Sequence, residues 1–155
     1  EEQATETAGM MYILSDIDRV GDLSLKLVQC VRDKIEKKYK YSSEAMKELR
    51  KSLELINELY EDVMKVLNTG DIENAKELSK RKEQILDLDI KMRKHHMKRV
   101  NEGRCKANLT APFTKILHSI NRMGNSCVNM ADAAINDMNF KYFISNGEEE
   151  TEKAE

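Results

Sequence analysis

The sequence has one proline, six glycines, no tryptophan and only 5% aromatic residues among 155 positions. An all-β domain needs frequent turn breakers and strands rich in aromatic or β-branched side chains, so this shortage excludes a sandwich or a barrel. The longest apolar run that we find, when glycine is allowed, is Ala8–Leu14, far short of the roughly 20 residues that cross a bilayer. We therefore expect a soluble chain built from helices.

The three cysteines are Cys30, Cys105 and Cys127, an odd number with no Cys-x-x-Cys pair. Neither a disulfide framework nor a structural zinc site is indicated, and a reducing, intracellular setting fits. The chain carries 26 Lys and Arg against 28 Asp and Glu, which disfavours a nucleic acid as partner. It has no secretory signal and begins at Glu1 without a methionine, so we expect further sequence upstream.

Apolar residues recur at spacings of three and four along four segments of similar length. Ser42 is a candidate N-cap, Gly70 a candidate C-terminal stop, and Pro112 suits the first turn of a helix. Short connections force successive helices to lie antiparallel, so residues 1–144 are predicted to form an all-α, antiparallel up-down four-helix bundle. Residues 145–155 are predicted to be a disordered acidic tail. The four segments cover residues 8–39, 43–68, 71–101 and 110–140.

The first segment has an apolar stripe that we predict to face the core of the bundle. The fourth segment repeats one feature of the first, because Arg19 and Gly21 match Arg122 and Gly124. Glycine inside a helix costs about 1 kcal/mol relative to alanine, so both glycines are predicted to lie close to the backbone of another segment. The stripe comprises Leu14, Ile17, Gly21, Ser24, Val28, Val31 and Ile35.

Two pairs of acidic residues, each four positions apart, are the candidate metal ligands. Such a spacing stacks two carboxylates on one helix face, and midpoints of antiparallel helices lie at similar height, so the pairs can converge on a hard cation. The alternative is that the acids are solvated or paired with Arg19 and Arg122. The four candidates are Asp18, Asp22, Glu83 and Asp87.

A basic stretch covers residues 91–106, where seven Lys and Arg side chains stand against the single acid Glu102. Basic residues near the C-terminus of a helix compensate the helix dipole, which is the simpler interpretation. The alternative is a pole that attracts an anionic partner.

Several motifs together resemble a known family. Residues 15–22 read Ser-Asp-Ile-Asp-Arg-Val-Gly-Asp, residues 121–125 read Asn-Arg-Met-Gly-Asn, and residues 129–131 read Asn-Met-Ala. They resemble the repeated Glu-Arg-Ile-Gly-Asp…Asn-Ile-Ala signature of PhoU domains. Residues 96–105 look more specifically like the PhoU-like C-terminal domain of bacterial sodium/phosphate cotransporters. The resemblance spans about residues 10–140.

The resemblance implies a regulatory bundle at the cytoplasmic face of the plasma membrane, attached to a membrane transport unit of the same polypeptide. It would act on phosphate uptake without catalysis, by docking to that unit or to a second copy as a homodimer. Some PhoU proteins hold metal clusters through pairs of acids, but Asn121 and Asn125 stand here where acids are usual. No cofactor is therefore required, and a divalent metal is the remaining candidate.

Three alternatives remain open at this point. The first is a free-standing PhoU-type adaptor of phosphate signalling. The second is a metal-dependent helical-bundle enzyme using the four acids, although no cysteine has a convincing histidine and acid partner and no glycine-rich phosphate loop occurs. The third is a coiled-coil dimerisation module.

Overall fold

The computed structural model describes residues 2–136, in which every regular element is helical. The predicted all-α class is therefore confirmed for this part of the chain, while the predicted tail at 145–155 lies outside it. None of these helices combines the length and the apolar character needed to cross a membrane. The elements are α1 (Glu2–Glu36), α2 (Ser43–Thr69), α3 (Ile72–Ser79), α4 (Arg81–Asn101), the 3-10 turn Ala107–Leu109 and α5 (Thr110–Asn136).

The ends of α2 and the start of α3 follow from local sequence. The Ser42 hydroxyl accepts a hydrogen bond from the backbone N–H of Ala45 at 3.1 Å and caps α2. Gly70 adopts a φ of 67° and donates to the Val66 carbonyl at 2.8 Å, which ends the helix in the left-handed conformation that glycine favours. The Asp71 carboxylate then caps α3 by accepting a backbone N–H of its first turn.

The predicted third helix, over residues 71–101, is two helices. The interruption lies at Lys80, between α3 and α4. Next to it, the Ser79 hydroxyl donates a hydrogen bond to the Asp132 carboxylate on α5. The break therefore coincides with a side-chain link to a distant helix, which periodicity along the sequence does not reveal.

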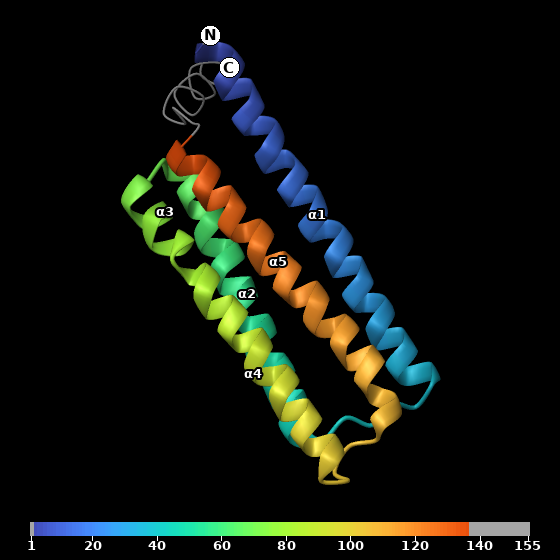
Figure 1. Ribbon diagram of the computed structural model, residues 1–155. Coiled ribbons are helices and arrows are strands. Elements are labelled where there is room, and N and C mark those ends of the chain that lie inside the picture. Colours follow the sequence, from blue (N-terminus) through green and yellow to red (C-terminus); the bar gives the residue numbers. More distant parts are fainter. Residues whose placement is uncertain (1, 137–155) are drawn as a thin grey trace.

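The core of the molecule surrounds α5. Figure 1 shows α5 lying between α1 on one side and α3 and α4 on the other, and α5 also contacts α2. The chain descends along α1, returns along α2, descends along α3 and α4, and ascends along α5 in this view. Because helices surround it on several sides, much of α5 is buried, and one face that carries Lys115, His118 and Arg122 stays exposed. Its buried side chains include Phe113, Leu117, Ile120, Cys127, Val128 and Met130.

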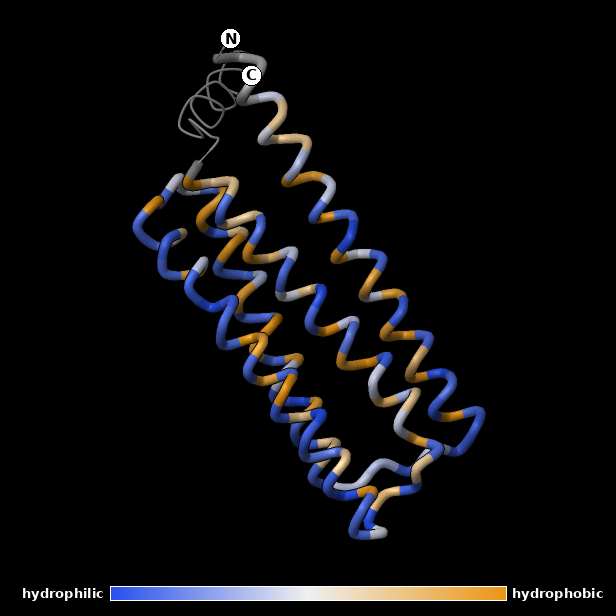
Figure 2. The backbone as a smooth tube through the Cα atoms, in the orientation of Figure 1, coloured by the Kyte–Doolittle hydropathy of each residue, from blue (hydrophilic) through white to orange (hydrophobic). Residues whose placement is uncertain are grey.

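The face of α1 that packs against α5 lies one position before the predicted one along the sequence, although Ile17 of the predicted face also packs against the core. The buried side chains of α1 are Ile13, Asp16, Leu23 and Cys30. Apolar residues recur along the whole of α1 (Figure 2), so the helix has neighbouring apolar stripes, and α5 packs against only one of them. Within the described chain, α1 hardly contacts any helix other than α5. The predicted residues that are more than half exposed are Leu14, Val28, Val31 and Ile35.

The two mid-helix glycines have different surroundings. A Cβ atom at Gly124 would lie 2.8 Å from Cδ1 of Ile85 and 2.9 Å from Cδ1 of Ile56. The close approach predicted there is real, although side chains rather than a backbone make it. A Cβ atom at Gly21 would meet nothing within 4 Å, so the prediction for Gly21 is wrong.

Candidate functional site

An open groove of about 850 Å³ runs between α1 and α2, with α5 beneath it; we call it the α1–α2 groove. It exists because α1 packs on α5 and hardly touches α2 in the described chain, so the space between the two outer helices is not filled. The walls and floor are mainly apolar. They include Ile17, Val20 and Leu27 from α1, Leu53 and Tyr60 from α2, and Met123 from α5.

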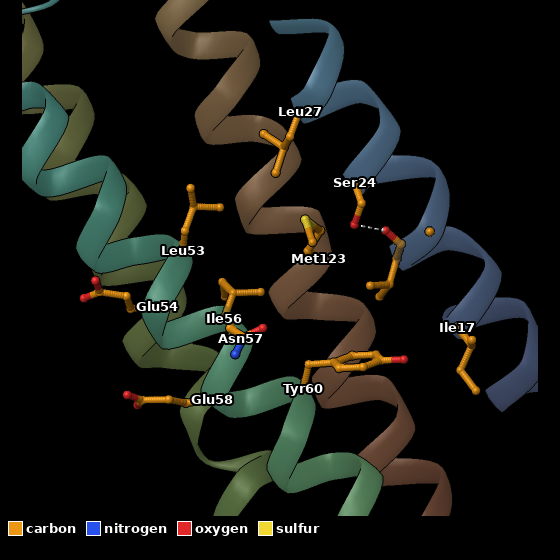
Figure 3. A pocket seen from close by; sticks show the side chains of 12 residues that line it. Ile17, Ser24, Leu27, Leu53, Glu54, Ile56, Asn57, Glu58, Tyr60 and Met123 are labelled. Carbon is orange, nitrogen blue, oxygen red and sulfur yellow. Dashed lines mark hydrogen bonds between the residues drawn. The ribbon is translucent and has the colours of Figure 1, made fainter. Parts of the chain in front are cut away.

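Figure 3 shows how these side chains lie. Tyr60 extends from α2 across α5 towards α1, whereas Glu54 and Glu58 point away from the groove. The Ser24 hydroxyl is occupied, because it donates to the backbone carbonyl of Val20 at 2.8 Å. The groove therefore presents apolar surface and a tyrosine ring, with its carboxylates on the rim.

The groove continues towards the loop that joins α1 and α2. A second hollow of about 290 Å³ shares Leu27, Leu53 and Glu54 with the first and extends to Tyr41 and Met46. Together the two hollows follow both helices over several turns. This is the shape and chemistry that accepts the apolar face of another helix.

The rim charges differ between the two ends of the groove. Glu58 borders only the first hollow, Lys34 and Arg50 border only the second, and Glu54 borders both. A helix docked along the groove would be favoured with basic residues towards the acidic end and acidic residues towards the basic end.

The cysteine and the tyrosine that line the second hollow, Cys30 and Tyr41, are uncharged at physiological pH. Burial raises the pKa of the Cys30 thiol. Burial also raises the pKa of Tyr41 to about 12. Neither side chain is an activated nucleophile.

The four acids proposed as metal ligands do not converge. All four are exposed, and the helices that carry them, α1 and α4, lie on either side of α5 (Figure 1). Within residues 2–136, no three His, Cys, Asp or Glu side chains are gathered as a metal site would require. The predicted cluster of Asp18, Asp22, Glu83 and Asp87 is thus not formed within the described chain, and metal binding itself stays a prediction.

Asn121 and Asn125, the two amides on α5, form a hydrogen bond with each other: Nδ2 of Asn125 donates to Oδ1 of Asn121 at 3.0 Å.

The acid that pairs with Arg19 also differs from the predicted ones. Arg19 pairs with Asp16 at 3.4 Å, and Asp16 is the acid on α1 that is buried. Sequence reasoning passed over Asp16, although its position three residues before Arg19 was the available signal.

Burial raises the pKa of the Cys127 thiol on α5 to about 12, and the negative charge of Asp16 contributes to the rise. Asp16, in the motif of residues 15–22 on α1, is therefore close enough to α5 for its charge to act on Cys127, whereas Asp18 and Asp22 are exposed. We interpret Asp16 and Cys127 as part of the α1–α5 contact, with the exposed Arg19 paired to Asp16 at its edge.

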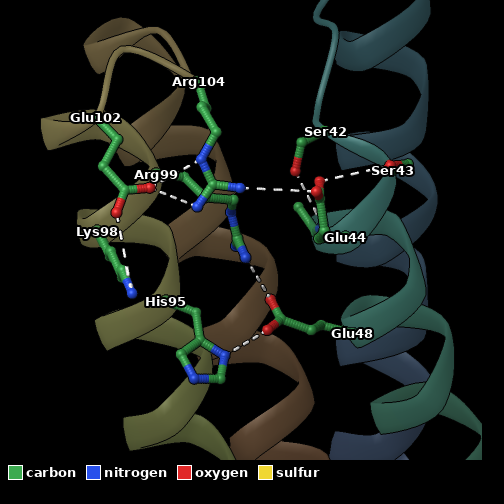
Figure 4. Close-up of polar contacts among 10 residues, drawn as sticks. Ser42, Ser43, Glu44, Glu48, His95, Lys98, Arg99, Glu102 and Arg104 are labelled. Atoms are coloured by element: carbon green, nitrogen blue, oxygen red, sulfur yellow. Dashed lines mark hydrogen bonds and ion pairs between the residues drawn. The ribbon is translucent and has the colours of Figure 1, made fainter.

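At the other end of the molecule a polar cluster joins α4 to α2 (Figure 4). The Glu48 carboxylate accepts a hydrogen bond from Nη1 of Arg99 at 3.0 Å, and its second oxygen lies 2.5 Å from Nδ1 of His95. The Arg99 side chain is almost completely buried. Its backbone carbonyl accepts the N–H groups of Arg104 and Cys105, so the same residue also ends α4. This cluster is a structural link between helices.

His96 completes the link to α5. Its ring stacks on Phe113 with 4.4 Å between centroids, and Nε2 lies 3.1 Å from the Thr110 hydroxyl. Burial lowers the pKa of His96, and the nearby Arg99 charge lowers it further against the opposing effect of Glu48. We therefore expect a neutral histidine that supports packing.

The basic stretch is less available to an anion than its composition predicts. Arg93 pairs with Asp89 at 2.7 Å. Arg99 pairs with Glu48, and Arg104 pairs with both Glu44 and Glu102 (Figure 4). All three arginines of the stretch are thus paired with neighbouring carboxylates. The simpler interpretation, charges that stabilise this end of the structure, is the one that these contacts favour.

The chain is similar in sequence to proteins of one known family. The model of the PhoU domain matches residues 49–134 of the chain. The chain is also 26% identical over 144 residues to a protein of Thermotoga maritima called phosphate-specific transport system accessory protein PhoU homolog 1. That match covers 91% of this chain and 61% of the relative, so the chain spans less than two thirds of the relative's length. No solved structure gives a significant match.

Proposed function

Because this chain belongs to the PhoU domain family, we propose that it is a non-enzymatic regulator of phosphate transport that acts by docking to a transport unit. The Thermotoga maritima relative is named as an accessory protein of a phosphate-specific transport system, which supports the free-standing adaptor over a domain fused to its transporter. The resemblance of residues 96–105 to the sodium/phosphate cotransporter domain keeps the fused arrangement as the second candidate. Either arrangement places the chain at the cytoplasmic face of the plasma membrane.

The α1–α2 groove is the observation on which this proposal rests. Its two hollows, of about 850 and 290 Å³, offer a continuous apolar channel along two helices. We propose that an amphipathic helix of the transport unit lies there, with its apolar side on Leu53, Tyr60 and Met123. An antiparallel up-down arrangement of the bundle is part of this proposal, since it keeps both walls side by side over the length of such a helix.

Regulation requires that docking distinguish two states of the transporter. Binding of the bundle shifts the transporter towards the state for which the bundle has the higher affinity. If the bundle binds both states with equal affinity, the equilibrium between them does not change. In the proposed mechanism, the partner helix is exposed in the restrained state and withdrawn in the transporting state. Neither a cofactor nor nucleic acid takes part.

A substitution in the groove tests this mechanism. Leu53→Arg places a charge in both hollows at a residue that is already partly exposed, so the fold should tolerate it. The matched control is Leu86→Arg, which changes an exposed leucine of α4 that lines neither hollow. Phosphate uptake is measured in bacteria that lack their own PhoU-type regulator and receive each variant.

We expect the wild-type chain and Leu86→Arg to restrain uptake and Leu53→Arg to lose that effect. Circular dichroism and unfolding midpoints confirm that both variants are folded. Equal restraint by a folded Leu53→Arg variant would overturn the groove as the docking site. Unchanged uptake with the wild-type chain would overturn the regulatory function itself.

A further inference from the structure

The outward side of α1 carries eight exposed residues at alternating spacings of three and four. Five are apolar, with exposed fractions between 51% and 69%. Single exposed apolar residues are ordinary, but a regular heptad seam is typical of a helix that packs against another helix. We call these residues the outer stripe: Met11, Leu14, Asp18, Gly21, Leu25, Val28, Arg32 and Ile35.

The contacts among residues 2–136 do not use this stripe. α5 packs on the other side of α1, around Ile13, Leu23 and Cys30. The α1–α2 groove is lined by different residues of α1, with only Gly21 in common. The outer stripe is about 36 Å long at 1.5 Å per residue and is unpartnered in the described chain.

The two charges of the outer stripe are placed symmetrically. Asp18 lies seven residues before Leu25 and Arg32 lies seven residues after it, so all three share one helix face. No other residue of the described chain forms an ion pair with Asp18 or Arg32. If a second α1 lies antiparallel across a twofold axis beside Leu25, each Asp18 comes next to the partner's Arg32.

This arrangement of charges favours a second copy of the chain as the partner, with its α1 antiparallel. A parallel pairing would set Asp18 beside the partner's Asp18 and Arg32 beside the partner's Arg32, and both contacts would be repulsive. The antiparallel pairing instead satisfies both charges twice, as an isologous interface requires. Gly21, where a Cβ would meet nothing within 4 Å, leaves room for the two helices to approach closely.

We propose that two copies of this chain associate through the outer stripes of α1, antiparallel, with Leu25 at the twofold axis. A single helix pair is a small interface, so the dimer is weak and concentration-dependent. The inference does not depend on the proposed function, because the stripe and the groove are separate surfaces.

Charge reversal tests the pairing. Sedimentation equilibrium of residues 1–155 is measured at concentrations up to about 0.5 mM for the wild type, Asp18→Arg, Arg32→Asp and the double variant. Each single reversal turns two attractions into two repulsions and should weaken dimerisation at least about tenfold, whereas the double variant should restore it. The control is Asp87→Arg, which reverses an exposed charge of α4 and should leave dimerisation unchanged.

A covalent probe tests the position of the axis. Leu25→Cys should give a disulfide-linked dimer on mild oxidation, and Leu86→Cys, on α4, should not, since the three native cysteines are buried. A wild-type chain that stays monomeric at every concentration, or a double variant that fails to restore the dimer, would overturn the proposal. If a variant loses the dimer but still restrains phosphate uptake, the proposed function is unaffected.

Discussion

Glu48 on α2 accepts a hydrogen bond from the buried guanidinium of Arg99 on α4, with 3.0 Å between Oε2 and Nη1. Residues 51 positions apart in the sequence are thereby fixed at one end of the bundle. Arg99 has further nitrogen atoms, Nε and Nη2, that are buried without a protein partner. Its charge therefore depends on Glu48 for compensation.

Removing the Glu48 charge should destabilise the fold. Glu48→Gln leaves the Arg99 charge buried without its counter-ion, and we expect a loss of about 2 kcal/mol because Glu48 itself is partly exposed. Urea unfolding measures this, with Glu58→Gln on the groove rim as the control that should change stability by less than about 0.5 kcal/mol. Equal midpoints for the two variants would contradict the account of this cluster.

The two mid-helix glycines should respond to alanine in opposite ways. Gly21→Ala gains helix propensity in open space and should stabilise the protein by about 0.5–1 kcal/mol. Gly124→Ala brings a methyl group against Ile85 and Ile56, and the overpacking should outweigh the same gain and destabilise by about 1 kcal/mol. Thermal unfolding of dilute protein compares them, and stabilisation by both would show that the contact around Gly124 is not tight.

Protonation of His96 should destabilise the protein at mildly acidic pH. Its pKa in the folded state is below the ordinary value of 6.5, chiefly through burial. The stabilisation from the neutral ring is therefore complete above about pH 6.5 and is lost as the pH falls through the lowered folded-state pKa. Urea midpoints from pH 7.5 to pH 5 should fall more steeply for the wild type than for His96→Gln. Parallel curves would assign the pH dependence to other groups.

Cys127 should be unreactive in the native protein. With a pKa of about 12 it is almost entirely a thiol at pH 8, and it is completely buried in the α1–α5 contact. Wild type and Cys127→Ser should therefore react with DTNB identically when folded. After unfolding in guanidinium, the variant should release one equivalent fewer. A difference between the folded proteins would place Cys127 at an accessible surface.

Much of the fold follows from local sequence signals. Ser42, Gly70 and Asp71 set helix ends through bonds made within a few residues, and such ends can be predicted. The face of α1 that is buried could not be predicted, because Ile13 and Leu14 each begin an apolar stripe and only the position of α5 decides which stripe is buried. The break at Lys80 likewise accompanies a bond from Ser79 to a residue on α5.

The candidate site was less accessible to sequence reasoning. The α1–α2 groove depends on how far α1 lies from α2, a tertiary property that leaves no mark on Leu53 or Tyr60. The two pairs of acids were visible in the sequence, but the prediction that they converge assumed that α1 and α4 face each other. In the structure α5 lies between them, so spacing identified the pairs without placing them.

Crosslinking from inside the α1–α2 groove identifies the protein that docks there. A photoreactive amino acid replaces Tyr60, which points across the groove, or Leu86 on α4 as the control (Figure 3). The chain is expressed with each candidate transport unit, the phosphate-specific transporter or the sodium-driven cotransporter, and irradiated in membranes. We expect a covalent product with one transport unit from position 60 and none from position 86. Equal crosslinking from both positions, or none from position 60 while the folded chain restrains phosphate uptake, would show that the groove is not the docking site.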